Sequence, residues 1–246
     1  MIHYHGTPVS GTQQDAARFL AGRHALIPFA RPDHLAAALA VCQSVVLDNS
    51  AFTYWRSGRG EVDVAAYHAW TESLAGHPSL DWCLIPDKID GTEAENVELV
   101  TTWLRMGSRV QSVPVWHLHE SLDWLDYLIR HFQTVALGSS GQWSTPGTSA
   151  WWQRMGEAMA VACDGRGRPR ARLHGLRMLD PEVFIRLPLA SADSTNAAVN
   201  AGSVARFGSY VPPTAGLRAE VIASRIEAHN SAAEWVPQGE QHALAI

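Results

Sequence analysis

Three aspartates, Asp48, Asp87 and Asp193, each stand at the end of a short apolar run of the sequence. Such runs are typical of buried β-strands. The carboxyl ends of parallel strands meet on one side of a sheet, so we expect the three carboxyl groups to converge. When two carboxyl groups share a buried pocket, their pKa values are pushed apart, and one can stay an ionised nucleophile while the other carries a proton. The pattern therefore predicts nucleophilic or acid–base catalysis.

Histidines end three further runs, at His5, His117 and His174. Small or apolar residues would be expected at these positions if the strand ends had only a structural role. We therefore assign His117 and His174 to substrate binding. The sequence leaves open whether His3 and His5 bind anything.

Two segments could receive a flat ligand. Asn49 and two small residues follow Asp48, and Phe52 comes next. Small residues let a ligand approach the backbone, and the aromatic ring can stack on it. A Gly-rich turn begins at Gly138 and Ser139, and its backbone N–H groups could meet a phosphate or a carbonyl, although it lacks the Lys-Ser/Thr pair of the phosphate loop. Both segments are assigned to substrate binding.

Eight apolar, β-rich runs would have to position these residues, and amphipathic helical patterns lie between most of them. Asp63, the pair Thr92 and Glu95, and Asp180 supply helix-start signals. The expected strands are Ile2–His5, Ala25–Phe29, Ser44–Asp48, Asp81–Asp87, Ser112–His117, Thr134–Gly138, Arg172–Leu176 and Leu189–Asp193. The expected helices are Val64–Leu74, Glu93–Met106, Leu122–Phe132, Ser149–Cys163, Pro181–Leu187 and Thr214–Asn230.

Strands that alternate with helices indicate an α/β fold with a parallel sheet. Eight such units in 246 residues favour a single (β/α)8 TIM barrel, a fold of about 250 residues, over an open sheet with one strand misassigned. We expect residues 1–246 to form one catalytic domain.

Composition narrows the function classes. The net charge of −5 gives no global attraction to nucleic acid, so any such contact needs a local basic patch. The three cysteines have no CxxC spacing, which argues against a disulfide framework and a structural zinc site. No basic-flanked apolar leader and no apolar stretch of about 20 residues is present, so we expect a soluble, cytoplasmic protein without a membrane partner.

The order of these motifs resembles that of the tRNA-guanine transglycosylase superfamily, TIM-barrel enzymes that exchange guanine for a 7-deazaguanine in a polynucleotide. The match covers nearly the whole chain as an ordered series. Residues 48–52, Asp-Asn-Ser-Ala-Phe, resemble the family's Asp-Ser-Gly-Gly-aromatic motif, with Asn49 in place of the typical residue. Asp87 matches the aspartate that recognises the purine edge, and Gly138 resembles the turn that meets the purine carbonyl. Asp193 matches the family's nucleophile.

Two departures qualify the resemblance. His117 stands where the family carries a base-contacting glutamine, and the cysteine-rich zinc subdomain that follows the nucleophile in the tRNA enzymes is absent. A short, zinc-free member looks more like the phage enzymes that place 7-deazaguanines of the preQ0 type in DNA. The resemblance therefore implies DNA, rather than tRNA, as the polynucleotide partner, a free 7-deazaguanine base as the second substrate, and the host cytoplasm as the site of action.

The resemblance also implies a mechanism that needs no metal and no cofactor. Asp193 would attack C1′ of a deoxyguanosine and form a covalent glycosyl-enzyme, while Asp48 would move protons to and from the bases. Asn196 and an arginine cluster could hold DNA phosphates around the flipped nucleotide. The cluster consists of Arg166, Arg168, Arg170, Arg172 and Arg177. An oligomer or a helper protein remains open.

A different enzyme class is suggested by the HxH spacing of His3 and His5. Metal-dependent amidohydrolases use such a pair together with a histidine and an aspartate from later strands, here His117 and Asp193. In that alternative, a bound metal ion would activate water for hydrolysis.

A non-catalytic alternative is a base-binding subunit of a larger modification complex. Its partner surface could be formed by some of the ten tryptophans, although packing in the core explains most of them better. The tryptophans considered are Trp116, Trp143, Trp151 and Trp152.

Overall fold

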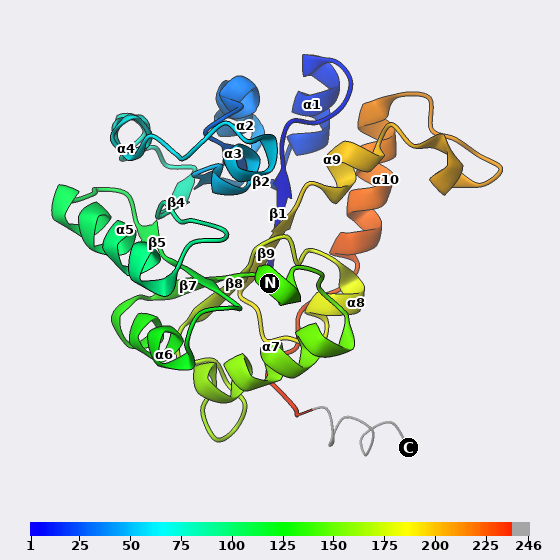
Figure 1. Ribbon diagram of the computed structural model, residues 1–246. Coiled ribbons are helices and arrows are strands. Elements are labelled where there is room, and N and C mark those ends of the chain that lie inside the picture. Colours follow the sequence, from blue (N-terminus) through cyan, green and yellow to red (C-terminus); the bar gives the residue numbers. More distant parts are fainter. Residues whose placement is uncertain (238–246) are drawn as a thin grey trace, which may run out of the picture.

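The protein is a TIM barrel, in which a parallel sheet closes on itself inside a ring of helices (Figure 1). The computed structural model describes residues 1–237, apart from the side chain of residue 206, so residues 238–246 of the expected domain lie outside it. The strands are β1 (Ile2–Gly6), β2 (His24–Pro28), β3 (Ser44–Asp48), β4 (Leu80–Leu84), β5 (Ser112–Val113), β6 (Val115–His117), β7 (Thr134–Gly138), β8 (Arg172–Gly175) and β9 (Ser191–Ser194).

The sheet closes at Pro114. The strand order is β5-β4-β3-β2-β1-β9-β8-β7-β6, and every pairing is parallel. β5 and β6 are separated by a single residue, Pro114. The strand is interrupted there because proline has no N–H to donate to a neighbouring strand. Its carbonyl still accepts from Ala136 N at 2.9 Å. The predicted strand Ser112–His117 is therefore one barrel strand in two segments, and the prediction of eight barrel strands is confirmed.

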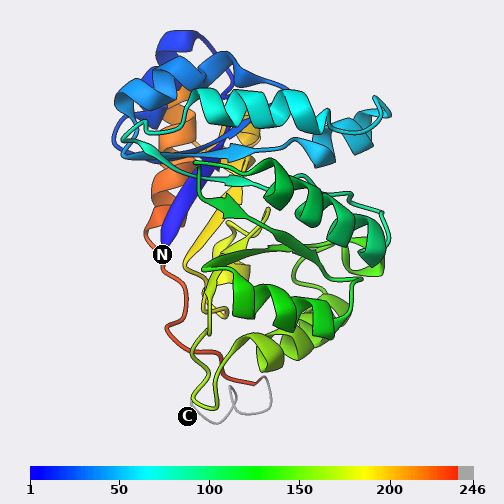
Figure 2. The same cartoon turned by 90° about the vertical axis from the view of Figure 1, so that its left-hand side faces the viewer.

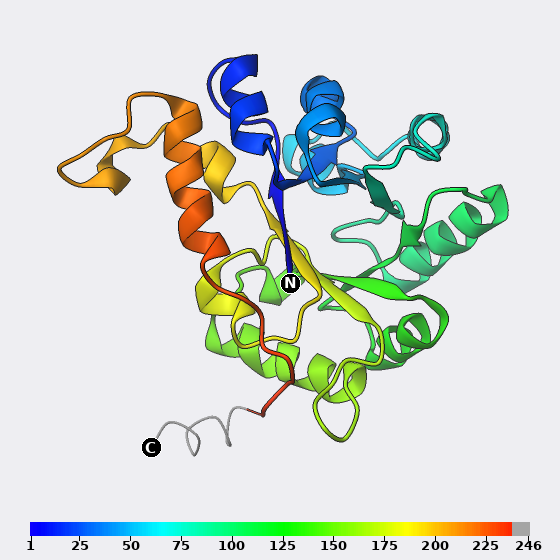
Figure 3. The ribbon, with the colours of Figure 1, turned by 180° about the vertical axis from the view of Figure 1, so that it is seen from behind.

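The helices surround the strands on the outside, as the side and rear views show (Figures 2 and 3). Asp63 caps α4, Thr92 and Glu95 form a capping box on α5, and Asp180 caps α8, all as predicted. The helices are α1 (Gln13–Leu20), α2 (Leu35–Val41), α3 (Ala51–Ser57), α4 (Val64–Ser73), α5 (Glu93–Met106), α6 (Leu122–His131), α7 (Ser149–Ala162), α8 (Pro181–Phe184), α9 (Asn196–Asn200) and α10 (Ala215–Glu227).

Four of these helices, α1, α2, α3 and α9, were not predicted from the sequence. α1 had a readable signal, because Thr12 and Asp15 form a capping box. α3 and α9 have only seven and five residues and directly follow strand ends, which leaves little room for helical periodicity. Among the described residues, no helix is long and apolar enough to cross a membrane.

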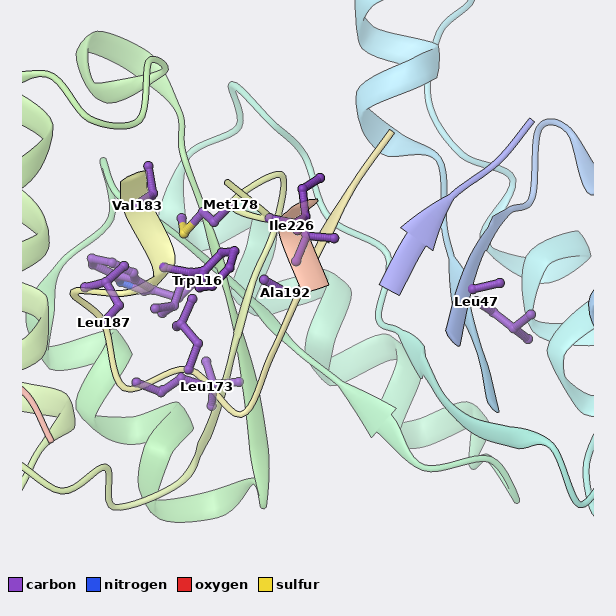
Figure 4. Close-up of a cluster of buried hydrophobic side chains, with 14 of the residues drawn as sticks. Leu47, Trp116, Leu173, Met178, Val183, Leu187, Ala192 and Ile226 are labelled. Atoms are coloured by element: carbon purple, nitrogen blue, oxygen red, sulfur yellow. The ribbon is translucent and has the colours of Figure 1, made fainter. Parts of the chain in front are cut away.

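Alternation along the strands produces two apolar layers. Tyr4, Val46 and Trp82 belong to the layer inside the barrel, and Tyr4 Oη donates to Oδ2 of the exposed Asp81 at 2.6 Å. The larger outer layer lies between the strands and the helices. Figure 4 shows part of it, with Trp116 and Leu173 pointing toward one another. The same alternation decides which polar side chains face inward at the strand ends.

Candidate active site

A cavity of about 740 Å³ opens at the carboxyl ends of the strands. Asp48, Asp87 and Asp193 all line it. Side chains alternate between the two faces of a strand. On β3, Leu47 faces the outer layer, and on β9, Ala192 does. The next residues along these strands, Asp48 and Asp193, therefore face the barrel axis. The structure therefore brings together the three carboxyl groups that the sequence singled out.

Asp48 is the carboxyl group with the most perturbed acidity. Burial raises its pKa, and the negative charges of Asp193 and Asp87 raise it further, whereas a hydrogen bond from the backbone of Ser50 acts in the opposite direction. The resulting pKa is about 7. At neutral pH, Asp48 can therefore both donate and accept a proton, which is what a group with acid and base roles requires.

Asp193 is held through one of its two oxygens. Oδ1 accepts from the backbone N of Arg177 at 3.0 Å, and His174 Nε2 lies 3.3 Å from the same atom. Within residues 1–237, no hydrogen bond reaches Oδ2. Because Asp193 is only 5% exposed yet lines the cavity, its second oxygen is available to a ligand there.

Asp87 is fixed by two neighbours. Asn49 Nδ2 donates to Asp87 Oδ1 at 2.8 Å, and His117 Nε2 donates to Oδ2 at 2.8 Å. Asn49 is itself buried, and it also donates to Ile85 O and accepts from Ala51 N. Each carboxylate oxygen has a second lone pair, so Asp87 can still accept from a ligand.

The neighbours of His117 raise the pKa of its imidazole. Burial lowers its pKa, but the hydrogen bond and charge of Asp87, together with the charge of Glu120, outweigh this effect and raise it. Glu120, which the sequence analysis missed, is 2% exposed and accepts from His117 N at 2.8 Å. Gly138 lies against the imidazole, since a Cβ at that position would come within 2.9 Å of His117 Nδ1. The glycine is therefore required to make room for the histidine.

The remaining predicted contacts fall at different depths. Ser139 and Asn196 line the cavity; Ser139 Oγ accepts from Trp151 Nε1, and Asn196 Oδ1 accepts from Asn200. His174 does not line it. This side chain is 0% exposed inside the barrel, where it contacts Trp82 and hydrogen-bonds to Ser191, so its assignment to substrate binding is wrong. Its place below Asp193 suits a positioning role.

Phe52 lines the cavity as expected, and the guanidinium of Arg177 lies 4.1 Å above its ring centre. Arg177 is the one member of the predicted arginine cluster that is found at this end of the barrel. The other four precede β8 or stand at its first residue, at the amino ends of the strands, so their assignment to DNA around the cavity is wrong. They are Arg166, Arg168, Arg170 and Arg172. Arg31 and Arg56, which the sequence analysis missed, do line the cavity.

The histidine pair on β1 does not face the cavity. His3 Nε2 contacts the carbonyl of His229, and His5 Nε2 contacts Glu227 Oε1 at 2.8 Å. Both side chains therefore point outward to α10 and the segment after it, while Tyr4 between them points inward. The four ligands of the amidohydrolase alternative do not come together in the structure.

The tryptophans of the non-catalytic alternative do not form an exposed surface. Trp116 and Trp151 are fully buried, Trp152 is 7% exposed, and half-buried Trp143 is covered by the guanidinium of Arg154. They stabilise the outer core.

Comparison with known proteins supports the fold. No protein-family model matches the sequence, and no curated protein matches it. A tryptophan synthase α-subunit mutant from Pyrococcus furiosus is similar in structure, with a TM-score of 0.53 at 12% identity over 93% of this chain and 97% of that one. A candidate fructose-1,6-biphosphate aldolase from Coccidioides immitis has a TM-score of 0.50 at 14% identity over 92% and 89%. At these identities the likeness shows the barrel fold alone.

Proposed function

We propose that this protein is a DNA-guanine transglycosylase, which exchanges a guanine in DNA for a free 7-deazaguanine. The observation that carries the proposal is the convergence of Asp48 and Asp193 on one cavity. Its volume of about 740 Å³ lies within the range of roughly 300–1,000 Å³ that is typical of small-molecule sites, so a purine and a sugar can be accommodated together.

The first half of the reaction breaks the glycosidic bond. The free oxygen of Asp193 attacks C1′ of the deoxyguanosine, a C–O bond forms, and the electron pair of the C1′–N9 bond leaves with guanine. Protonated Asp48 delivers its proton to the leaving base. The pKa of Asp48, about 7, supports this assignment, because a substantial fraction of the group is protonated at neutral pH.

The second half reverses the roles. Asp48, now ionised, removes a proton from the incoming 7-deazaguanine, whose ring nitrogen attacks C1′ and releases the carboxylate of Asp193. In the proposed reaction Asp87 accepts from the N–H groups of the purine edge, and its hydrogen bonds to Asn49 and His117 support this role. The backbone at Ser50 also supports the resemblance, because its φ of 67° is a conformation in which glycine, the residue of the family motif, is favoured.

The proposal is tested by mixing the protein with duplex DNA and a radiolabelled 7-deazaguanine and measuring the label in the DNA. We expect incorporation by the wild type and none by Asp193→Asn. Asp48→Asn should lose at least about 100-fold, the lower range for removing an acid–base group. Asp123→Asn, an exposed carboxylate on α6, is the matched control and should retain activity.

A second readout concerns the covalent step. Wild type incubated with DNA and no free base should yield a protein–DNA adduct on a denaturing gel, and Asp193→Asn should not. An Asp193→Asn enzyme that still incorporates label would exclude Asp193 as nucleophile. Incorporation into tRNA but not into DNA would show that the polynucleotide substrate is tRNA and not DNA.

A further inference from the structure

The cavity has opposite charges at its two depths. Its inner wall carries the three buried or partly buried aspartates, and its mouth carries the exposed arginines Arg31, Arg56 and Arg177. A chain with a net charge of −5 has no general excess of cations, so three arginines around one opening form a local feature. A ligand that matches this arrangement has hydrogen-bond donors at its inner end and an anion at its outer end.

Two of the three guanidinium groups are free to bind an anion. Arg31 is engaged by Asp33 at 2.8 Å. Arg56 makes no ion pair or side-chain hydrogen bond with any residue in the described range, and the guanidinium of Arg177 contacts the ring of Phe52 without a carboxylate partner there. A guanidinium is matched to phosphate because it can donate two parallel hydrogen bonds.

Aromatic side chains stand beside these cations. The rings of Phe52 and Trp55 lie 5.6 Å apart, and Trp55 is 48% exposed on the surface. Guanidinium groups interleaved with exposed aromatic rings are typical of surfaces that bind single-stranded nucleic acid, where bases stack and phosphates pair with arginine. A polynucleotide, unlike inorganic phosphate, carries bases that can stack on Trp55.

We infer that Arg56 and Arg177 form a phosphodiester-binding site at the mouth of the cavity, with Trp55 as a stacking surface for a neighbouring base. The inference rests on the proposed function, because it names the groups that hold the polynucleotide while one nucleotide enters the cavity. It also replaces the cluster at residues 166–172, which lies at the opposite ends of the strands.

The test is DNA binding by chains that all carry Asp193→Asn, so that chemistry does not contribute. A fluorescein-labelled single-stranded DNA with one guanine is titrated at 50–300 mM NaCl and followed by anisotropy. Arg56→Gln and Arg177→Gln should each weaken binding about tenfold at the lowest salt, and each should reduce the salt slope by about 0.7, the value for one phosphate on a single strand. Arg166→Gln, an exposed arginine at the amino end of the barrel, should leave both unchanged.

Conservative variants and competitors sharpen the result. Arg56→Lys and Arg177→Lys keep the charge and should keep the salt slope. Unlabelled DNA should compete at far lower concentration than deoxyguanosine monophosphate or inorganic phosphate. Equal competition by inorganic phosphate, counted per phosphate group, would show a free-anion site and overturn the inference. The inference would also be overturned by unchanged affinity and salt slope in the Arg56→Gln/Arg177→Gln double variant, or by a parent that does not bind DNA at 50 mM NaCl.

The two proposals can fail separately. If DNA binding depends on Arg56 and Arg177 but the wild type exchanges no base, the phosphodiester site is supported and the transglycosylase function is excluded. If the wild type exchanges bases but the arginine variants bind DNA like the parent, the function is supported and the phosphodiester site is excluded.

Discussion

The contact between Gly138 and His117 makes a sharp prediction for Gly138→Ala. The new Cβ would lie 2.9 Å from His117 Nδ1, 3.2 Å from His117 Cε1 and 3.3 Å from Val115 Cγ1. The imidazole cannot easily retreat, because it is 2% exposed and bonded to Asp87 at 2.8 Å on its other side. The substitution therefore overpacks a rigid part of the barrel.

Overpacking of this kind destabilises a protein by about 1–3 kcal/mol. For a domain of roughly this size, each kcal/mol shifts Tm by about 2–4 °C, so we expect a fall of roughly 2–12 °C in a thermal melt. If His117 moves away from Asp87, the proposed exchange activity per folded molecule should fall as well. Gly165→Ala is the matched control, because nothing lies within 4 Å of its Cβ position, and its Tm should be unchanged or slightly higher.

A double-mutant cycle identifies the clashing group. In a His117→Ala background the space beside residue 138 is empty, so Gly138→Ala should then cost little. A Gly138→Ala protein that melts within about 1 °C of wild type, or a loss that is the same in both backgrounds, would refute the argument that the glycine exists to accommodate the imidazole.

Three further predictions concern the titration of Asp48, the part-buried hydrogen bond of Tyr4 and the positioning role of His174. The folded-state pKa of Asp48, about 7, lies above the ordinary value of 3.8, so its contribution to stability is present below about pH 4 and is lost as the pH rises toward 7. Asp48→Asn should lack this loss, and at about 1.4 kcal/mol per pH unit it should be more stable than wild type at pH 8 by at most about 4 kcal/mol. Urea unfolding of both proteins at pH 4 and pH 8 checks this prediction. Tyr4→Phe removes the donor of a part-buried hydrogen bond to exposed Asp81 and should lower the free energy of unfolding by about 0.5–1.5 kcal/mol, measured by the same method. Equal stability would show that the hydrogen bond contributes nothing net. His174→Gln should reduce kcat of base exchange with little change in KM and should alter its pH profile, since His174 lies against Asp193 without lining the cavity; a changed KM alone would count against positioning.

The fold was readable from the sequence because buried parallel strands are short apolar runs and their helices carry capping signals. The convergence of Asp48, Asp87 and Asp193 followed from one rule, that the carboxyl ends of parallel strands share a side. The same rule could have excluded the arginines at 166–172, because they precede their strand. Strand alternation could also have predicted that His5 points outward, because Tyr4 and the histidines on either side of it must face opposite sides of the strand.

Other features needed three dimensions. A sequence does not say how deep an inward-facing residue sits, so His174 was placed with the ligand contacts although it lies buried beneath Asp193. Nor does it show that Glu120 supports His117, or that Arg56, on a short helix with little periodicity, reaches the mouth of the cavity. These relations depend on packing between segments that are far apart in the chain.

The pairing of β1 with β9 has a consequence for how the proposed activity would return during refolding. β1 pairs with β2 on one side and with β9 on the other, so the two halves of the site, Asp48 and Asp193, come into register only when the first and last strands meet. Contacts between such distant segments form slowly, because the chain loses the entropy of closing a long loop before the contacts stabilise it. Recovery of the proposed base-exchange activity after dilution from denaturant should therefore report on closure of the barrel, and it should come later than the return of helical circular dichroism.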